Sequence, residues 1–317
     1  MSTVKALHLP KWCEWRRGPG PLGLALALLC SLTGGRLMSD EAQPLVNVYV
    51  LAGQSNAEGH NTANSYTPAP FPSWLRHQTN VLFWPGSNAK SSLRNAWTHL
   101  QIGASEIGPQ AFGPEVSFGY VMASANTNAR IAIIKYAAGG TGIARSRDYQ
   151  DYIDHPQLVG FNDHGRNWHW PEPQAPAGDL YTNLLANVRT ALAELKRQGR
   201  DYRLAGFLWM QGEHEAGISP RMAQDYEGLL TGLIQHVRRD LAQPNLPFVI
   251  GQISDKWIFH SVVQAAQTRV CQSDSHTALI VTRDLPRTPG DDAHYTANGM
   301  ITLGERFAAS MKTLTHP

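Results

Sequence analysis

The chain has 317 residues, of which 42% are hydrophobic and 16% are charged, so it contains enough apolar material to form a sizeable core. Its formal net charge is only +2, and residues 40–317 alone carry 22 basic and 24 acidic residues. A body this close to neutral lacks the basic face that a nucleic-acid-binding protein needs. Composition therefore argues against nucleic acid as a partner.

The first 39 residues have the order of segments that is typical of an export signal. A basic stretch, residues 11–17, precedes an apolar run, residues 21–33, and small and polar residues follow. The apolar run is shorter than the roughly 18–20 residues that cross a bilayer comfortably. We therefore expect residues 1–39 to be a signal peptide with a short leader, and the protein to be exported to the periplasm or the extracellular space. No stable membrane insertion is expected after cleavage; an uncleaved membrane anchor is the alternative.

From residue 43 onward, short apolar runs alternate with stretches of helical periodicity. The runs are nearly continuous in apolar character, as in strands that are buried on both faces of a parallel sheet. They cover residues 46–52, 81–84, 130–136, 204–210, 248–253 and 278–282. Helices are expected at residues 115–125, 180–198, 220–241, 259–272 and 296–314. This alternation predicts a single α/β domain over residues 40–317, a three-layer α/β/α sandwich with a mainly parallel central sheet.

The segment Gly53-Gln-Ser-Asn56 directly follows the first expected strand. In an open α/β sheet, ligands bind where the carboxyl ends of the strands release the chain into loops. A serine at this place can present its hydroxyl at the edge of the sheet, and its backbone N–H can face an oxyanion. The alternative is that Ser55 only caps a helix.

Two later segments can supply hydrogen-bond donors or a carboxylate. The glycines of Tyr136-Ala-Ala-Gly-Gly-Thr141 allow close backbone approach, so their N–H groups can face a developing oxyanion. After the strand at 204–210, Gln211 offers a side-chain N–H and Glu213 offers a carboxylate. A tight turn and the start of a helix are the structural alternatives. Glu115 opens an expected helix, so we expect it to interact with the helix dipole rather than to act in catalysis.

The segment Asp291-Asp-Ala-His-Tyr295 lies between the last expected strand and the last helix. A serine hydroxyl becomes a good nucleophile when a base removes its proton, and a carboxylate can hold that base in the required tautomer. His294 follows Asp291 by three positions, so the two side chains can meet within one turn. The alternative is that Asp291 or Asp292 caps the last helix and His294 lies on the surface.

Taken in order, the segments 53–56, 113–115, 135–141, 211–213 and 291–295 resemble the SGNH hydrolase superfamily. More narrowly, they resemble its sialate O-acetylesterase-like branch, which includes acetylxylan esterases of the sixth carbohydrate esterase family. The resemblance implies a flavodoxin-like fold and a carboxylic ester hydrolase that removes acetyl groups from carbohydrates. It also implies that no metal and no organic cofactor is needed.

The resemblance implies roles for individual residues. Ser55 corresponds to the nucleophile, His294 to the base, and Asp291 to the residue that orients the base, with Asp292 as the alternative. The N–H groups of Ser55 and Gly140, or its neighbour Gly139, correspond to oxyanion donors. The side chain of Gln211 corresponds to a third donor.

Five further residues are candidates for substrate binding or support of the site. The two tryptophans among them are included because their rings can stack on sugar faces. These candidates are Gln54, Asn56, Glu213, Trp168 and Trp170.

Three other functions fit parts of the pattern. An esterase, lipase or thioesterase for other acyl groups could use the same residues. A non-catalytic carbohydrate-binding protein is a second alternative, which the intact set of Ser55, Asp291 and His294 argues against. A zinc hydrolase is the third, but the histidines of the long polar segment 148–178 do not have a recognised zinc spacing with a matching third ligand.

Overall fold

The computed structural model describes residues 43–60, 62, 73–86, 93–104, 108, 110–126, 128–150 and 166–315. The chain divides into a short unit, Met1–Glu41, and a compact unit, Ala42–Pro317, and all described residues belong to the second. The expected signal peptide lies outside the described residues, and the domain boundary at residue 39 stays a prediction. Within the described ranges, no helix is both long and apolar enough to cross a membrane.

A seven-stranded sheet forms the centre of the compact unit. Its strand order is β3-β2-β4-β1-β5-β6-β7, and all neighbouring strands are parallel except the pair β2 and β3. The strands are β1 (Val46–Gly53), β2 (His77–Pro85), β3 (Thr98–Gln101), β4 (Arg130–Ala137), β5 (Tyr202–Met210), β6 (Phe248–Gly251) and β7 (Thr277–Ile280).

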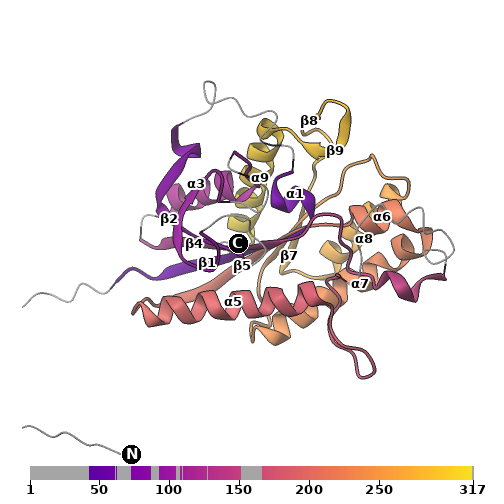
Figure 1. Cartoon of the computed structure of the whole chain (residues 1–317), viewed down its shortest axis with the longest axis horizontal. Coiled ribbons are helices and arrows are strands. Elements are labelled where there is room, and N and C mark those ends of the chain that lie inside the picture. The colour runs from indigo at the N-terminus through magenta and orange to yellow at the C-terminus, as the bar shows by residue number, and fades with distance from the viewer. Residues whose placement is uncertain are drawn as a thin grey trace, which may run out of the picture. The chain divides into compact units, whose positions relative to one another are not determined.

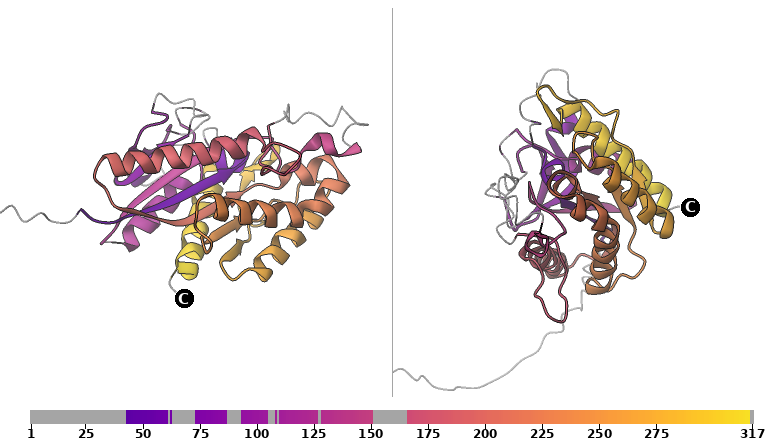
Figure 2. Two further views of the ribbon diagram at one scale, coloured as in Figure 1. Left: turned by 90° about the horizontal axis from the view of Figure 1, so that it is seen from below. Right: turned by 90° about the vertical axis from the view of Figure 1, so that its right-hand side faces the viewer.

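Helices cover both faces of this sheet, as Figures 1 and 2 show. On one face lie α3 (Glu115–Ala125) and α9 (Ala297–Thr315); on the other lie α5 (Asp179–Arg197), α7 (Pro220–Asp240) and α8 (His260–Ser273). Alternate side chains of β1 enter the two cores, Val48 and Val50 on the side of α5 and α7, and Tyr49 and Leu51 on the side of α3 and α9. Burial on both faces explains the unbroken apolar run of this strand. The predicted three-layer sandwich is confirmed.

Several short elements were not expected from the sequence. β3 is a short antiparallel edge strand, and α6 (Glu213–Ile218) precedes α7. A hairpin of β8 (Arg287–Thr288) and β9 (Asp291–Tyr295) replaces the expected turn. The three strands among these elements are short and polar, and they form by pairing with distant or bulged partners rather than from a local apolar pattern.

β1 lies in the middle of the sheet, between β4 and β5. The chain builds the strands on one side of β1 first and then, after β4, crosses to the other side with β5. The loops that follow these three strands therefore diverge at the carboxyl end of β1, which is where α/β folds bind ligands. The single turn α1 (Ser55–Glu58) stands at this place, close to β9 (Figure 1).

Candidate active site

Ser55 begins α1, which follows β1 after one intervening residue. Gly53 makes this tight entry possible, because its φ is 140° and an added Cβ would lie 2.0 Å from the carbonyl oxygen of Met210. Gly59 ends the turn with a φ of 99°. The two glycines thus place Ser55, 7% exposed, at the carboxyl edge of the sheet.

A buried ion pair supports the end of this turn. The Nζ of Lys135 donates to the backbone oxygen of Glu58 at 2.9 Å and to Oε2 of Glu115 at 3.0 Å. Oε1 of Glu115 accepts from the N–H of Gly113 at 2.9 Å. Glu115 therefore binds Lys135 and the N–H of Gly113, and Lys135 joins α3 to the serine turn. The expected interaction of Glu115 with the helix dipole stays a prediction.

A bulge in the hairpin brings Asp291 and His294 together. The register pairs Arg287 with Tyr295 and Thr288 with Asp291, so residues 292–294 bulge out of the ladder. Residues three apart on a regular strand would point to opposite faces, and the bulge removes this obstacle.

His294 contacts Asp291 and not Asp292. Its Nδ1 lies 2.6 Å from Oδ2 of Asp291, whose Oδ1 accepts from the N–H of Ala293 at 3.2 Å. Asp292 is exposed. Burial by itself would raise the pKa of Asp291, but the hydrogen bond and charge of His294 outweigh it and hold this pKa below its usual range. A carboxylate on Nδ1 leaves Nε2 of His294 as the nitrogen that can exchange a proton.

The side chain of Asn56 joins the serine turn to the histidine strand. Its Nδ2 donates to the backbone oxygen of Ala293 at 3.0 Å and to Oε1 of Glu213 at 2.9 Å. Asn56 follows Ser55, and Ala293 precedes His294, so this buried amide ties together the neighbours of both residues. Glu213 is 1% exposed, and burial raises its pKa to about 7 although the hydrogen bond from Asn56 lowers it.

A second carboxylate–imidazole pair flanks His294. Nε2 of His60 lies 2.8 Å from Oε2 of Glu58, and the rings of His60 and His294 stack with centroids 5.2 Å apart. Burial raises the pKa of Glu58, but the hydrogen bond and charge of His60 and the N–H of Gly139 bring it below its usual value. Sequence reasoning missed both residues, although they follow Ser55 within five positions.

The loop after β4 lies against the serine turn. A Cβ added to Gly139 would lie 3.5 Å from Cβ of Ser55 and 2.8 Å from Oε2 of Glu58. Gly140 has a φ of 70°, in the left-handed region that favours glycine. Because Glu58 already accepts from the N–H of Gly139, the next N–H, that of Gly140, is the better candidate for an oxyanion donor.

Gln211 is fully buried, and its amide is bonded within the fold. Its Nε2 donates to Oε2 of Glu215 at 2.6 Å and to the backbone oxygen of Thr141 at 3.2 Å, and its Oε1 accepts from the hydroxyl of Tyr226 at 3.1 Å. Both N–H groups of the Gln211 amide therefore already have an acceptor within the fold. Gln54 lies beside it, with Oε1 3.5 Å from the same Nε2.

Glu215 holds the same loop from the other side, and sequence reasoning missed it. Its Oε1 accepts from the N–H groups of Ile143 at 2.6 Å and Ala144 at 3.1 Å. Gln211 and Glu215 together brace the segment that begins at the glycines. No sequence pattern marks Glu215, because only the fold brings α6 to this loop.

The two candidate tryptophans lie in packed surroundings. Trp168 is fully buried, and its Nε1 donates to Oγ1 of Thr141 at 2.9 Å. Trp170 stacks on His169, with ring centroids 4.2 Å apart, and on His236, at 4.9 Å. Trp168 thus offers no ring face to a sugar in this structure, and the stacking partners of Trp170 compete with one.

The arrangement has the chemical parts of an acyl-transfer site: a serine at a strand-to-helix turn, a carboxylate-bound imidazole and glycine N–H groups. Among the described residues, no group of three or more His, Cys, Asp or Glu side chains could hold a metal ion.

The family model of "carbohydrate esterase, sialic acid-specific acetylesterase" matches residues 45–313. The chain belongs to this family. The resemblance to the sialate O-acetylesterase-like branch is thereby confirmed, and with it the expected class of enzyme, a carbohydrate esterase. No curated protein sequence matches the chain.

Solved structures share the fold of this family member. A protein from Arabidopsis thaliana has a TM-score of 0.61 at 18% identity, covering 86% of this chain and 100% of its own. The protein NanS has a TM-score of 0.58 at 14% identity, covering 86% and 98%. A carbohydrate acetylesterase from Xanthomonas citri has a TM-score of 0.54 at 18% identity, covering 85% of this chain and 57% of its own. At these identities the likeness shows the fold alone.

Proposed function

We propose that the protein is a serine esterase that hydrolyses acetyl esters on carbohydrates, with Ser55 as nucleophile, His294 as base and Asp291 as the residue that orients the base. The observation that carries this proposal is the 2.6 Å contact between Asp291 and Nδ1 of His294, on a strand that Asn56 ties to the serine turn. This contact fixes the tautomer in which Nε2 can accept the proton of a serine hydroxyl.

The reaction proceeds in two acyl-transfer steps. Nε2 of His294 takes the proton of the Ser55 hydroxyl as Oγ attacks the acetyl carbonyl. The tetrahedral intermediate collapses, the bond to the sugar oxygen breaks, and His294 protonates that oxygen. His294 then takes a proton from water as the water attacks the acetyl-enzyme. The second tetrahedral intermediate collapses, acetate leaves, and His294 returns the proton to Oγ of Ser55.

The N–H groups of Ser55 and Gly140 stabilise the oxyanion in this mechanism. Gln211 takes a supporting role in place of the direct donor role expected from the sequence, because its amide already donates to Glu215 and Thr141. It holds the glycine loop at the distance that the oxyanion requires.

An acetylated carbohydrate is the substrate class that the family supports. Export through a signal peptide in residues 1–39 stays a prediction. It would bring the enzyme to acetylated carbohydrates outside the cytoplasm. The chain itself supplies the nucleophile, the base, the carboxylate and the N–H donors, so the mechanism uses no cofactor.

The test compares the protein with Ser55→Ala and a control, Ser73→Ala, whose serine is exposed in η1 (Ser73–Leu75). Release of 4-nitrophenol from its acetate and octanoate esters is measured, and then acetate release from acetylated xylan and O-acetylated sialic acid. We expect acetate-ester turnover to be lost only in Ser55→Ala. A preference for octanoate would contradict the acetyl specificity, and turnover that survives in Ser55→Ala would contradict the nucleophile.

A further inference from the structure

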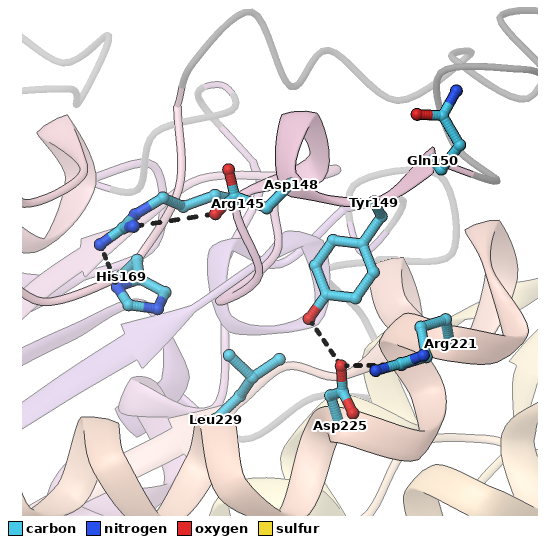
Figure 3. A pocket seen from close by; sticks show the side chains of 8 residues that line it. All are labelled: Arg145, Asp148, Tyr149, Gln150, His169, Arg221, Asp225 and Leu229. Carbon is cyan, nitrogen blue, oxygen red and sulfur yellow. Dashed lines mark hydrogen bonds and ion pairs between the residues drawn. The ribbon is translucent and has the colours of Figure 1, made fainter. Parts of the chain in front are cut away.

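A cavity of about 580 Å³ lies outside the proposed catalytic residues. Its polar lining includes Arg145, Asp148, Tyr149, His169, Arg221 and Asp225. Figure 3 shows Arg145 and His169 on one side and Tyr149, Asp225 and Arg221 on the other, with Leu229 between the two groups. The volume falls within the range of sites for small molecules.

The charged groups of the lining neutralise one another. The guanidinium of Arg145 lies 3.7 Å from Asp148, and that of Arg221 lies 3.5 Å from Asp225. Burial lowers the pKa of His169, which favours its neutral form. Glu172 lies 3.1 Å from the guanidinium of Arg145 as well. The two guanidinium groups thus meet three carboxylates, so the cavity has no excess positive charge with which to select an anionic ligand.

The same groups suit a neutral sugar. Carboxylate and guanidinium groups can each exchange two hydrogen bonds with a pair of adjacent hydroxyls. Tyr149 donates to Asp225 at 3.2 Å, which fixes its ring beside the cavity, and Leu229 adds apolar surface. A ring face next to polar groups matches the amphipathic surface of a sugar.

The cavity and the proposed oxyanion loop are formed by neighbouring parts of the same chain segment. Arg145 follows Gly140 by five positions, so their Cα atoms are at most about 18 Å apart. Between them, Glu215 fixes the N–H groups of Ile143 and Ala144. The cavity and the proposed oxyanion loop therefore belong to one short, braced segment of the chain.

We propose that this cavity binds a neutral sugar unit of the same carbohydrate chain that carries the acetyl ester at Ser55. The enzyme then prefers acetylated oligosaccharides over single acetylated sugars. This inference rests on the proposed function, because it assumes that an ester on a carbohydrate is the substrate.

The kinetic test uses two conservative variants, Asp225→Asn and Arg221→Gln. Arg221 is 70% exposed, so its loss does not threaten folding. The matched control is Arg269→Gln, which breaks an exposed ion pair with Glu227 on the neighbouring helix, outside the cavity. The substrates are 4-nitrophenyl acetate and chemically acetylated xylotetraose, cellotetraose and mannotetraose.

We expect both cavity variants to raise KM for at least one acetylated tetrasaccharide about tenfold, the effect of about 1.4 kcal/mol of lost binding. Turnover of 4-nitrophenyl acetate should stay unchanged, and Arg269→Gln should behave as the unmodified protein. Unchanged KM for all three tetrasaccharides, or an equal loss on 4-nitrophenyl acetate, would overturn the proposal.

A binding experiment separates this inference from the proposed function. Unacetylated xylotetraose, cellotetraose and mannotetraose are titrated calorimetrically into Ser55→Ala protein, with sialyllactose as the acidic comparison. Binding of a neutral tetrasaccharide that Asp225→Asn abolishes supports the cavity even if Ser55 is not the nucleophile. Preference for sialyllactose, or no binding of any of the three, would overturn the assignment of a neutral sugar.

Discussion

Two carboxylate–imidazole pairs stack against each other beside the serine turn, and they differ in the ring nitrogen that meets the carboxylate. Asp291 contacts Nδ1 of His294, whereas Glu58 contacts Nε2 of His60. In the first pair Nε2 stays available for a serine hydroxyl; in the second the carboxylate occupies it. Proximity of an acid to a histidine therefore does not define a base, and the geometry of the ring supports the proposal that His294 has that role.

The largest expected effect tests this difference directly. His294→Ala should lower kcat for 4-nitrophenyl acetate by about 10⁵–10⁶-fold, as loss of the base does in other serine hydrolases. His60→Ala removes the same ring, but it should cost no more than about tenfold, because a partly exposed ion pair contributes about 1 kcal/mol or less. Steady-state kinetics of both variants decide the matter. Equal losses of kcat would mean that the two histidines act as one functional unit, which would contradict the different roles proposed for them.

The carboxylate of the first pair gives the next effect. Asp291→Asn keeps the shape of the side chain but favours the wrong tautomer of His294, so kcat should fall by about 10⁴-fold. Asp292→Asn is the matched control, because Asp292 is exposed and does not contact the ring. The pH profile of kcat/KM should shift for Asp291→Asn alone. A full loss in Asp292→Asn would mean that the hairpin rearranges when substrate binds.

The part of the fold that is visible in the sequence is the part that is buried on both sides. β1, β4 and β5 are continuous apolar runs because each contributes to two cores, and their bounds agree closely with the expectation. The hairpin of β8 and β9 has no such signal, since residues 287–295 are mostly polar. Its pairing depends on a bulge that only the folded chain specifies.

The candidate site shows the same division. Ser55, Asp291 and His294 lie in short segments whose residue types and spacing point to acyl-transfer chemistry. The contact of His60 with His294, and the bond from Gln211 to the backbone oxygen of Thr141, arise between segments distant in sequence. Side-chain amides such as Gln211 can donate to an oxyanion or to the fold, and only their partners distinguish the two roles.

Asn56 gives a further test of the difference between the two histidines, because it binds the strand of His294 and has no such bond to the Glu58–His60 pair. Asn56→Ala removes the donor to the backbone oxygen of Ala293, which loosens His294 relative to Ser55. We expect kcat to fall about 10–100-fold with little change in KM, the cost of one or two buried hydrogen bonds.

Asn126→Ala is the control for this variant, because it also loses a side-chain bond to a carbonyl, that of Met122 at the end of α3. Its kinetics should match the unmodified protein. A rise in KM with constant kcat in Asn56→Ala would instead indicate that Asn56 contacts the substrate.

The last prediction concerns the stability of the fold rather than activity, and it involves Glu213, the buried acid that accepts a hydrogen bond from Asn56. Its pKa is raised from 4.5 to about 7 in the folded protein, so the unfolded chain releases this proton first as pH rises. The free energy of unfolding therefore falls between those two pH values, by roughly 3 kcal/mol from this group. Glu213→Gln keeps an acceptor for Asn56 but cannot ionise, so its stability relative to the unmodified protein should rise across the same interval.

Urea unfolding of both proteins at pH 4.5 and pH 7.5 measures this difference, and other titrating groups cancel in the comparison. Glu227→Gln, at a partly exposed glutamate, should show no such rise. If the difference between Glu213→Gln and the unmodified protein does not change with pH, the pKa of Glu213 is the same in the folded and the unfolded chain, and its carboxylate is ionised in the folded protein at neutral pH. The link from Asn56 to the strand of His294 would then include a buried charge at neutral pH, and Asn56→Ala would destabilise the fold as well as displace the base.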